Sequence, residues 1–203
     1  MIRDAAEMLA PNMYFDPKFN LDAVKILPGE YYTTRRELVI VTVLGSCVSA
    51  CLRDPALGLG GMNHFMLPHE RHDGPAPISS AARYGTYAME VLINNLVRLG
   101  ARRERIEVKL FGGGQVVKGF TTTNVGEKNA RFAIDYMKTE GLNVVAADLL
   151  DSFPRKVYFF PRTGRVLVRK LQRLNNDTIA QRERDYEARL AHSSFGGDVE
   201  LFN

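Results

Sequence analysis

The stretch of residues 38–52 constrains the fold more than any other part of the chain. It starts within a β-branched, apolar run over residues 37–43, which is typical of a strand buried on both faces. From Val48 the apolar residues alternate with other residues until the turn signal Asp54-Pro55, and this alternation predicts a second strand. A short turn made of Gly45, Ser46 and Cys47 therefore joins two strands.

A third apolar stretch, residues 60–67, follows after a short loop, so residues 47–67 form a candidate hairpin. If the chain turns between Pro55 and Ala56, the antiparallel register places Cys47 directly opposite His64. Opposed side chains have Cβ atoms about 5 Å apart, within reach of a hydrogen bond between thiol and imidazole. A bulge at the neighbouring glycines would shift this register, and a slip of one residue would put the two side chains on opposite faces.

The remaining pattern predicts two helices and four more strands. Residues 80–99 carry apolar side chains at helical spacing and end at Gly100, and residues 126–140 form a second helical pattern that ends at Gly141. We expect further strands at residues 106–111, 142–148, 156–160 and 165–171, the last two joined by the turn of residues 161–164. Strands outnumber helices, and their order favours an α/β domain with a mixed, strand-rich sheet and two main helices on one side.

The two ends of the chain differ from this central part. Residues 1–30 show no sustained period, and residues 175–203 are rich in charge. We therefore expect an N-terminal extension over residues 1–30, one domain over residues 31–174 and a charged C-terminal tail over residues 175–203. Residues 175–190 are compatible with a solvated helix or a frayed tail, and the polar loop of residues 69–79 suits the border of a cleft.

Composition excludes several classes of protein. The chain has 203 residues, of which 45% are hydrophobic and 25% are charged, as expected for one soluble domain. Asp4 and Glu7 lie where a secretory signal would be basic and then apolar, and no apolar run reaches the roughly 18 residues of a membrane helix. We expect a cytoplasmic protein without membrane insertion. The net charge is +4, but the basic residues are spread along the chain and interleaved with acidic ones. The charge therefore does not favour a nucleic-acid partner.

Cys47 is the candidate nucleophile. A cysteine in a Gly-Ser turn after a buried strand can present its sulfur together with nearby backbone N–H groups, so Gly45 and Ser46 are candidates for oxyanion or turn support. His64 is the candidate proton-transfer partner, because a nearby imidazole lowers the pKa of a thiol and later returns a proton to the leaving group. The alternative is that Cys47 is a small buried apolar residue and that His64 is a core histidine.

Several other residues are better explained by a structural role than by catalysis or ligand binding. Cys51 shares the strand with Cys47 and suits packing, and two cysteines in a reducing compartment predict free thiols. His64, His69 and His72 lack a recognised metal-binding spacing, so we expect no metal and no cofactor. The glycines of residues 111–115 are not followed by the GK[ST] of a phosphate loop, so they predict a tight backbone turn near the site.

Two segments resemble the CheD family of chemoreceptor glutamine deamidases: VTVLGSCVSACLRDP at residues 41–55 and GGMNHFMLP at residues 60–68. Four further segments resemble the family's blocks, namely RYGTYAMEVLINNL, KLFGGG, VGEKNA and RKVYFFPRTGRVLVRKL, so that the likeness covers residues 35–172. The resemblance implies a three-layer α/β/β fold without cofactor. It also implies hydrolysis of glutamine side-chain amides on methyl-accepting chemotaxis receptors, which tunes chemotaxis signalling. Some members also resemble methylesterases in activity.

The resemblance also implies roles for individual residues. Cys47 attacks the amide carbon to form a thioester, donors near Ser46 stabilise the oxyanion, and His64 protonates the departing ammonia. Thr42 is the nearest match to the family's third site residue, a threonine that orients the histidine, although several members have one more residue in this turn. A second departure lies at residues 148–154, where many members carry a glycine pair.

Two other functions remain open at this stage. The chain could be a non-catalytic adaptor that binds a receptor or a CheC-type phosphatase, a partner of some family members. It could also be a cysteine peptidase or a small-molecule amidase that uses the same pair of side chains.

Overall fold

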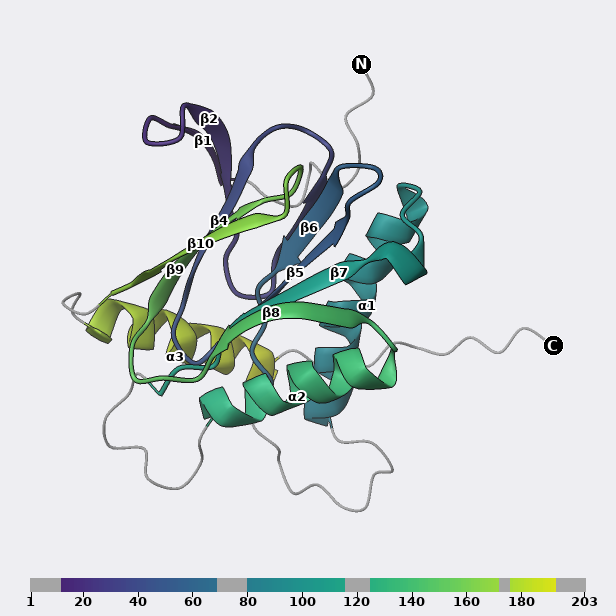
Figure 1. The fold of residues 1–203 in the computed structure, drawn as a ribbon. Coiled ribbons are helices and arrows are strands. Elements are labelled where there is room, and N and C mark those ends of the chain that lie inside the picture. Colours follow the sequence, from purple (N-terminus) through teal and green to yellow (C-terminus); the bar gives the residue numbers. More distant parts are fainter. Residues whose placement is uncertain (1–11, 69–79, 116–124, 172–175, 193–203) are drawn as a thin grey trace.

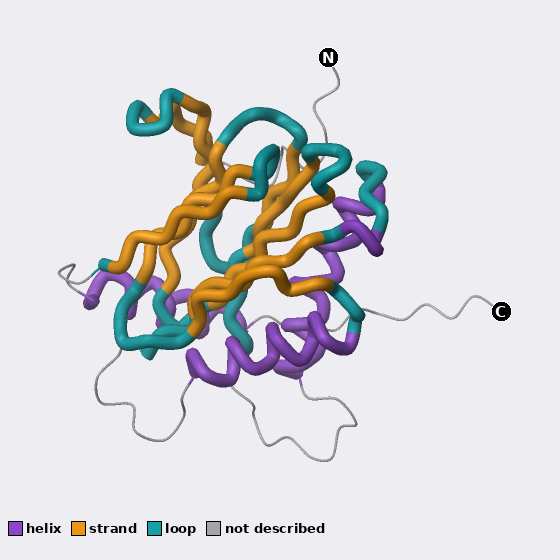
Figure 2. The backbone as a smooth tube through the Cα atoms, in the orientation of Figure 1, coloured by secondary structure: helices purple, strands orange, loops and turns teal. Residues whose placement is uncertain are grey.

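The computed structural model describes residues 12–68, 80–115, 125–171 and 176–192 (Figure 1). In this part of the chain the strands form two five-stranded sheets, and three helices accompany them. Figure 2 shows the helices gathered at one side and one end of the strands. The α/β fold class is therefore confirmed, and the strands divide between two sheets.

The first sheet, sheet A, has the order β1-β2-β4-β9-β10. Its strands are β1 (Asn12–Asp16), β2 (Leu21–Lys25), β4 (Val39–Leu44), β9 (Arg155–Phe160) and β10 (Arg165–Lys170). Two of these strands come from the segment that shows no period in the sequence. β2 pairs in parallel with β4, and its Ala23 and Val24 are fully buried, so residues 12–25 are part of the sheet.

The second sheet, sheet B, has the order β3-β6-β5-β7-β8. Its strands are β3 (Tyr31–Thr34), β5 (Val48–Asp54), β6 (Leu59–Asn63), β7 (Glu107–Gly112) and β8 (Asn143–Leu149). The helices α1 (Ser80–Arg98) and α2 (Val125–Thr139) contact strands of sheet B. Helices, sheet B and sheet A thus form three layers, as the family resemblance implies.

Local patterns place most elements correctly. The expected strands and helices from residue 37 to residue 171 are all present, with shifts of a few residues at their ends. Gly100 and Gly141 end α1 and α2 with positive φ angles of 98° and 65°. The charged segment after residue 175 contains a third helix, α3 (Asn176–His192), which resolves the choice between a helix and a frayed tail. The boundaries at residues 30 and 174 stay predictions.

The main core lies between the sheets and beneath α1 and α2. Along β4 the side chains of Ile40 and Leu44 belong to this core, whereas Val39 and Val41 pack in a small cluster with Tyr158. Thr42 has the same parity as Ile40 and Leu44, so it faces the core and is only 1% exposed. A buried hydroxyl at such a position needs a partner.

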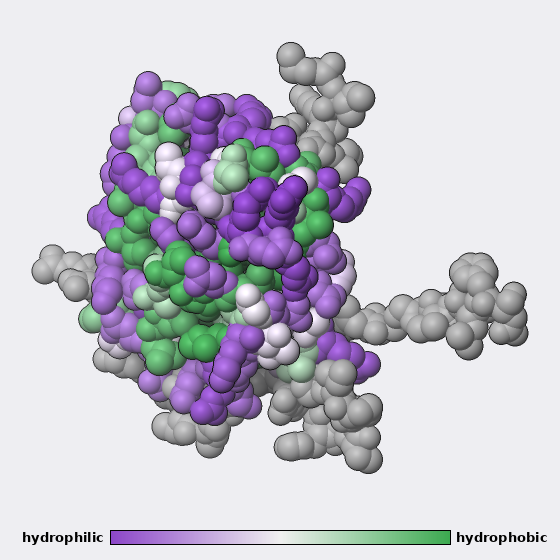
Figure 3. Space-filling model, turned by 45° about the vertical axis from the view of Figure 1, so that its right-hand side comes forward, coloured by the Kyte–Doolittle hydropathy of each residue, from purple (hydrophilic) through white to green (hydrophobic). Residues whose placement is uncertain are grey.

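Apolar surface remains outside the core. The strand β8 is an edge of sheet B, and its Val144 and Val145 are exposed. Figure 3 shows apolar side chains gathered on one face of the molecule and bordered by polar ones. Among the described helices, none is both long and apolar enough to cross a bilayer.

The loop after β8 has an unusual backbone. Leu150 and Asp151 have φ angles of 68° and 81°, in the left-handed region where glycine is favoured. These residues lie in the segment where the family resemblance implies a departure from a glycine pair. The fully buried Arg155 fixes the loop, because its guanidinium donates to the carbonyl groups of Asp148 and Leu150 and pairs with the Asp148 carboxylate at 3.0 Å.

The backbone of Leu150 predicts an effect on stability. Leu150→Gly should have a free energy of unfolding about 1 kcal/mol higher than Leu150→Ala, because alanine keeps the left-handed strain and glycine removes it. Both variants lose the same half-exposed side chain beyond Cβ, so the comparison isolates the backbone. Urea unfolding of the two variants measures the difference, and equal stability would show that the loop relaxes without strain.

Candidate active site

Cys47 lies in the turn between β4 and β5, and the domain holds every carbonyl group of this turn. Gly114 N–H donates to Gly45 O and Gly113 N–H donates to Cys47 O, each at 2.8 Å. The amide of Asn129, on α2, donates to Ser46 O at 2.9 Å. The turn is therefore fixed from one side, and its backbone N–H groups face the other.

The glycines at the end of β7 permit this contact. Gly112 has a φ of 113°, and a Cβ atom built on it would lie 2.2 Å from Cys47 O. Any side chain at this position would displace the turn that carries Cys47. The expected tight backbone turn at residues 111–115 is thus confirmed. It brings the backbone of Gly112 and Gly113 against the backbone of Cys47.

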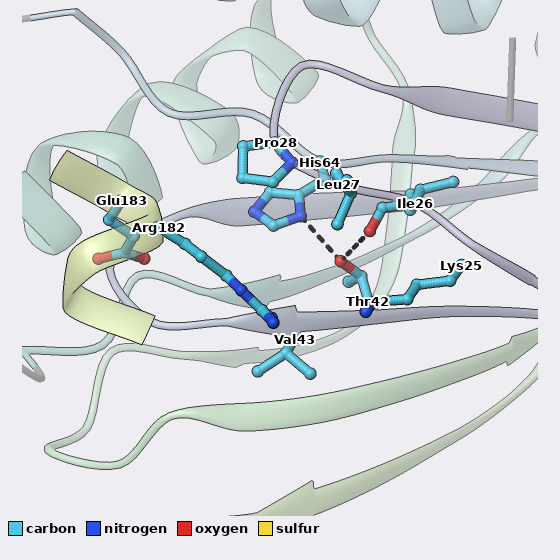
Figure 4. A pocket seen from close by; sticks show the side chains of 9 residues that line it. All are labelled: Lys25, Ile26, Leu27, Pro28, Thr42, Val43, His64, Arg182 and Glu183. Carbon is cyan, nitrogen blue, oxygen red and sulfur yellow. Dashed lines mark hydrogen bonds between the residues drawn. The ribbon is translucent and has the colours of Figure 1, made fainter. Parts of the chain in front are cut away.

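Thr42 and His64 meet across the two sheets. Thr42 comes from β4 in sheet A, and His64 directly follows β6 in sheet B. Thr42 Oγ1 lies 2.8 Å from His64 Nδ1 and also donates to Ile26 O at 2.8 Å (Figure 4). Because the single hydroxyl proton goes to Ile26, Nδ1 must carry the proton of the Thr42–His64 bond. The neutral imidazole consequently has its free lone pair on Nε2.

The expected register of the β5–β6 hairpin is wrong by two residues. Cys51 pairs with Met62, and the bridge between Val48 and Phe65 continues the same register. The turn lies one residue later than expected, because the loop after Asp54-Pro55 extends further before β6 begins. An even shift keeps side chains on the same face, so Cys47 and His64 remain on one face as diagonal neighbours. Within the described residues, His64 Nε2 has no hydrogen-bond partner.

Glu183 on α3 completes the site, and sequence reasoning missed it. Its Oε1 accepts hydrogen bonds from Ser46 N–H at 2.7 Å and from Cys47 N–H at 3.2 Å. Its Oε2 accepts a bond from Ser46 Oγ at 2.7 Å. In Figure 4, Glu183 and Arg182 project from α3 beside the imidazole of His64. The only sequence signal was that Glu183, Tyr186 and Leu190 share one helical face.

The electrostatics differ from the expected thiolate–imidazolium pair. Burial, followed by the negative charge of Glu183, raises the pKa of the Cys47 thiol well above its ordinary value. Burial lowers the pKa of His64 from 6.5 to about 3, and the nearby carbonyl of Ile26 opposes this shift only in part. The expectation of a low thiol pKa is wrong for this state, in which both groups are neutral because neither is solvated.

Little space remains beside these groups. A cavity of about 20 Å³, lined by Thr42, His64 and Glu183 among others, has room for about one water molecule. Tyr84 of α1 and Tyr186 of α3 form a hydrogen bond between their hydroxyl groups nearby. The site is thus closed over by α3.

The other candidate residues are accounted for as far as the structure describes them. Cys51 is a free, buried cysteine in β5, which agrees with a packing role. His69 and His72 lie outside the described residues, and so does the expected loop over residues 69–79. Among the residues the structure does describe, no three side chains of metal-ligand type lie together.

The site therefore has the parts of an acyl-transfer centre. A thiol lies in a turn with two adjacent N–H groups that converge on one oxygen, as donors to an oxyanion do. An imidazole in the tautomer of a general base lies on the same face. Such an arrangement suits attack on a carboxamide or an ester.

The chain is similar to known proteins along its whole length. A family described as CheD chemotactic sensory transduction matches residues 66–170. A protein of Methylobacillus flagellatus is 60% identical over 203 residues, which cover 100% of both chains. A protein of Herminiimonas arsenicoxydans is 58% identical over 197 residues, 97% of each chain. Both relatives are named as probable chemoreceptor glutamine deamidase CheD, and their coverage includes the Cys47 turn and His64.

The buried neutral imidazole predicts a loss of stability in acid. His64 binds a proton near pH 6.5 in the unfolded chain but only near pH 3 in the fold, so stability falls as the pH falls through this interval. From pH 7 to about pH 4 this contribution is about 3 kcal/mol. His64→Gln should lose that part of the pH dependence, whereas the acid loss due to Asp54, whose pKa is lowered mainly through Arg105 against the effect of burial, remains in both proteins.

Denaturant unfolding at a series of pH values measures this slope. Identical slopes for the wild-type protein and His64→Gln would contradict a buried neutral histidine. The slope is the quantity to compare, because the substitution also changes stability at pH 7.

Proposed function

The chain belongs to the CheD family, and from this premise we propose that it is a protein-glutamine deamidase that acts on methyl-accepting chemotaxis receptors. It would hydrolyse selected glutamine side-chain amides to glutamate and ammonia. The names of its relatives support the substrate. The observation that carries the proposal is the convergence of Ser46 N–H and Cys47 N–H on one carboxylate oxygen beside the Cys47 thiol.

In the first half of the reaction, Cys47 Sγ attacks the amide carbon as His64 Nε2 takes the thiol proton. The new C–S bond pushes the carbonyl electron pair onto the oxygen, which receives hydrogen bonds from the two backbone N–H groups. The oxyanion then collapses, and the C–N bond breaks. His64 gives its proton to the departing nitrogen, so ammonia leaves and a thioester remains.

In the second half, water attacks the thioester with His64 as the base. The C–S bond breaks, the thiol regains a proton, and the receptor carries a glutamate. Burial keeps the imidazole of His64 neutral at the start of each half-reaction, so the lone pair on its Nε2 is available to take a proton. Thr42 contributes by holding Nδ1–H, which leaves Nε2 free to move the proton.

The change made to the receptor is electrostatic. Each conversion of glutamine to glutamate adds one negative charge, and we propose that this charge tunes chemotaxis signalling from the cytoplasm. The competing proposal is an adaptor that binds the receptor or a CheC-type phosphatase without chemistry. The deamidase requires the thiol of Cys47, whereas the adaptor does not.

The first prediction concerns the nucleophile. A receptor cytoplasmic fragment incubated with the wild-type protein should show glutamine-to-glutamate conversion by peptide mass spectrometry. Cys47→Ala should lower the rate at least about a thousandfold, because it removes the atom that forms the covalent bond. Cys51→Ala is the matched control and should retain activity. A receptor that stays unmodified with the wild-type protein, yet is captured by it, would favour the adaptor.

A second prediction concerns Thr42. Thr42→Val keeps the shape of the side chain but removes the hydroxyl, so the imidazole loses the bond that fixes its tautomer and orientation. We expect the turnover rate to fall about tenfold to a hundredfold with little change in receptor binding. Thr42→Ser keeps the hydroxyl and should retain most of the activity. Equal activity of the valine variant and the wild type would exclude a positioning role for Thr42.

A further inference from the structure

We propose that α3 occupies the substrate site of its own chain, with the Glu183 carboxylate in the position of the product glutamate. The inference rests on the proposed function, since it interprets Glu183 by the reaction that Cys47 performs. It adds a regulatory consequence: a receptor segment can react only after α3 has left the site.

The hydrogen bonds of Glu183 support a product-like position. Its Oε1 takes the two backbone N–H bonds that an oxyanion would take, and its Oε2 takes the Ser46 hydroxyl. A glutamine side chain has the same length and shape. Its carbonyl oxygen could therefore replace Oε1, while its amide nitrogen would lie beside Ser46 Oγ.

The turn does not need Glu183 for its own structure. All three of its carbonyl groups are bound by Gly113, Gly114 and Asn129 of the domain. The N–H groups of Ser46 and Cys47 and the hydroxyl of Ser46 turn toward α3. A partner from a separate helix, 137 residues away from Ser46 in the chain, thus fills donors that the domain leaves open.

The contacts of α3 suit a helix that can leave. Among its described side chains, Glu183, Tyr186 and Leu190 are buried on one face, and the others are exposed. In Figure 1, α3 lies at the ends of the strands, and its Tyr186 reaches Tyr84 of α1 through a hydrogen bond between the hydroxyl groups. Three of the described side chains of α3 are buried, and a segment with few buried side chains opens more readily than the core strands.

Seating of α3 also keeps Cys47 from reacting with groups outside the chain. The remaining cavity holds about one water molecule, which is too small for a glutamine side chain. The thiol is buried, and the carboxylate beside it disfavours the thiolate. The apparent affinity for a receptor segment is then reduced by the fraction of molecules in which α3 is released.

Alkylation of Cys47 in the full-length protein tests this occupancy without a receptor. Glu183→Ala and Tyr186→Ala should each raise the rate of labelling by iodoacetamide at least about tenfold, the effect of a fall of one unit in thiol pKa. Asp185→Ala removes a carboxylate from an exposed position of the same helix and should label at the wild-type rate. Tandem mass spectrometry separates Cys47 from Cys51, whose burial in β5 makes it the internal control for folding.

The outcomes separate the two proposals. Faster labelling of Cys47 without any receptor deamidation would support occupancy by α3 and reject the deamidase. Receptor deamidation by the wild type with no change in labelling in either variant would reject occupancy and keep the deamidase. If Glu183→Ala also exposes Cys51, the variant is unfolded, and Tyr186→Ala decides.

Glu183→Gln tests the product-like position directly. The introduced amide should be converted to a carboxylate by the protein's own Cys47, so the peptide returns to the wild-type mass. The exposed Gln181 of the same helix is the control and should stay an amide, as should the introduced amide in a Cys47→Ala background. Persistence of the introduced amide in a protein that deamidates the receptor would overturn this position of Glu183.

Discussion

Three hydrogen bonds from the domain to the carbonyl groups of the Cys47 turn determine how the site is built. With these carbonyls bound by Gly113, Gly114 and Asn129, the N–H groups of Ser46 and Cys47 face the opposite side together. The contact requires the bare backbone of Gly112, and the glycine loop is itself bound to the segment after β8. The position of Cys47 thus depends on elements far from it in the chain.

The stacking of two sheets provides the second requirement. Thr42 faces the core from sheet A because it alternates with Val41 and Val43 on β4, and His64 faces it from the end of β6. Their hydrogen bond satisfies two buried polar groups that would otherwise destabilise the core. One hydrogen bond therefore both stabilises the core and orients the imidazole of His64, and it also determines the tautomer of that imidazole.

Local patterns in the sequence predict the strands and helices from residue 37 to residue 171, since these patterns report which face of each element is buried. They also bring Cys47 and His64 to one face, although the register is wrong by two residues because loop length is not encoded in apolar alternation. Residues 12–25 were missed because short strands leave almost no period. Glu183 could not be predicted, since its contact joins positions 137 residues apart and charged residues on a helix are usually solvated.

The charge of Glu183 bears on how a closed site can still serve catalysis. Burial is the main reason for the raised pKa of Cys47, and the carboxylate of Glu183 is the second. A receptor glutamine that takes this position is neutral, so its arrival removes the repulsion between carboxylate and thiolate while keeping the hydrogen bonds. Hydrolysis restores a carboxylate, which again disfavours ionisation of the thiol. On the proposed mechanism, the site thus favours the thiolate only while a neutral amide occupies it. The Glu183 carboxylate of α3 keeps the thiol neutral when no receptor segment is bound.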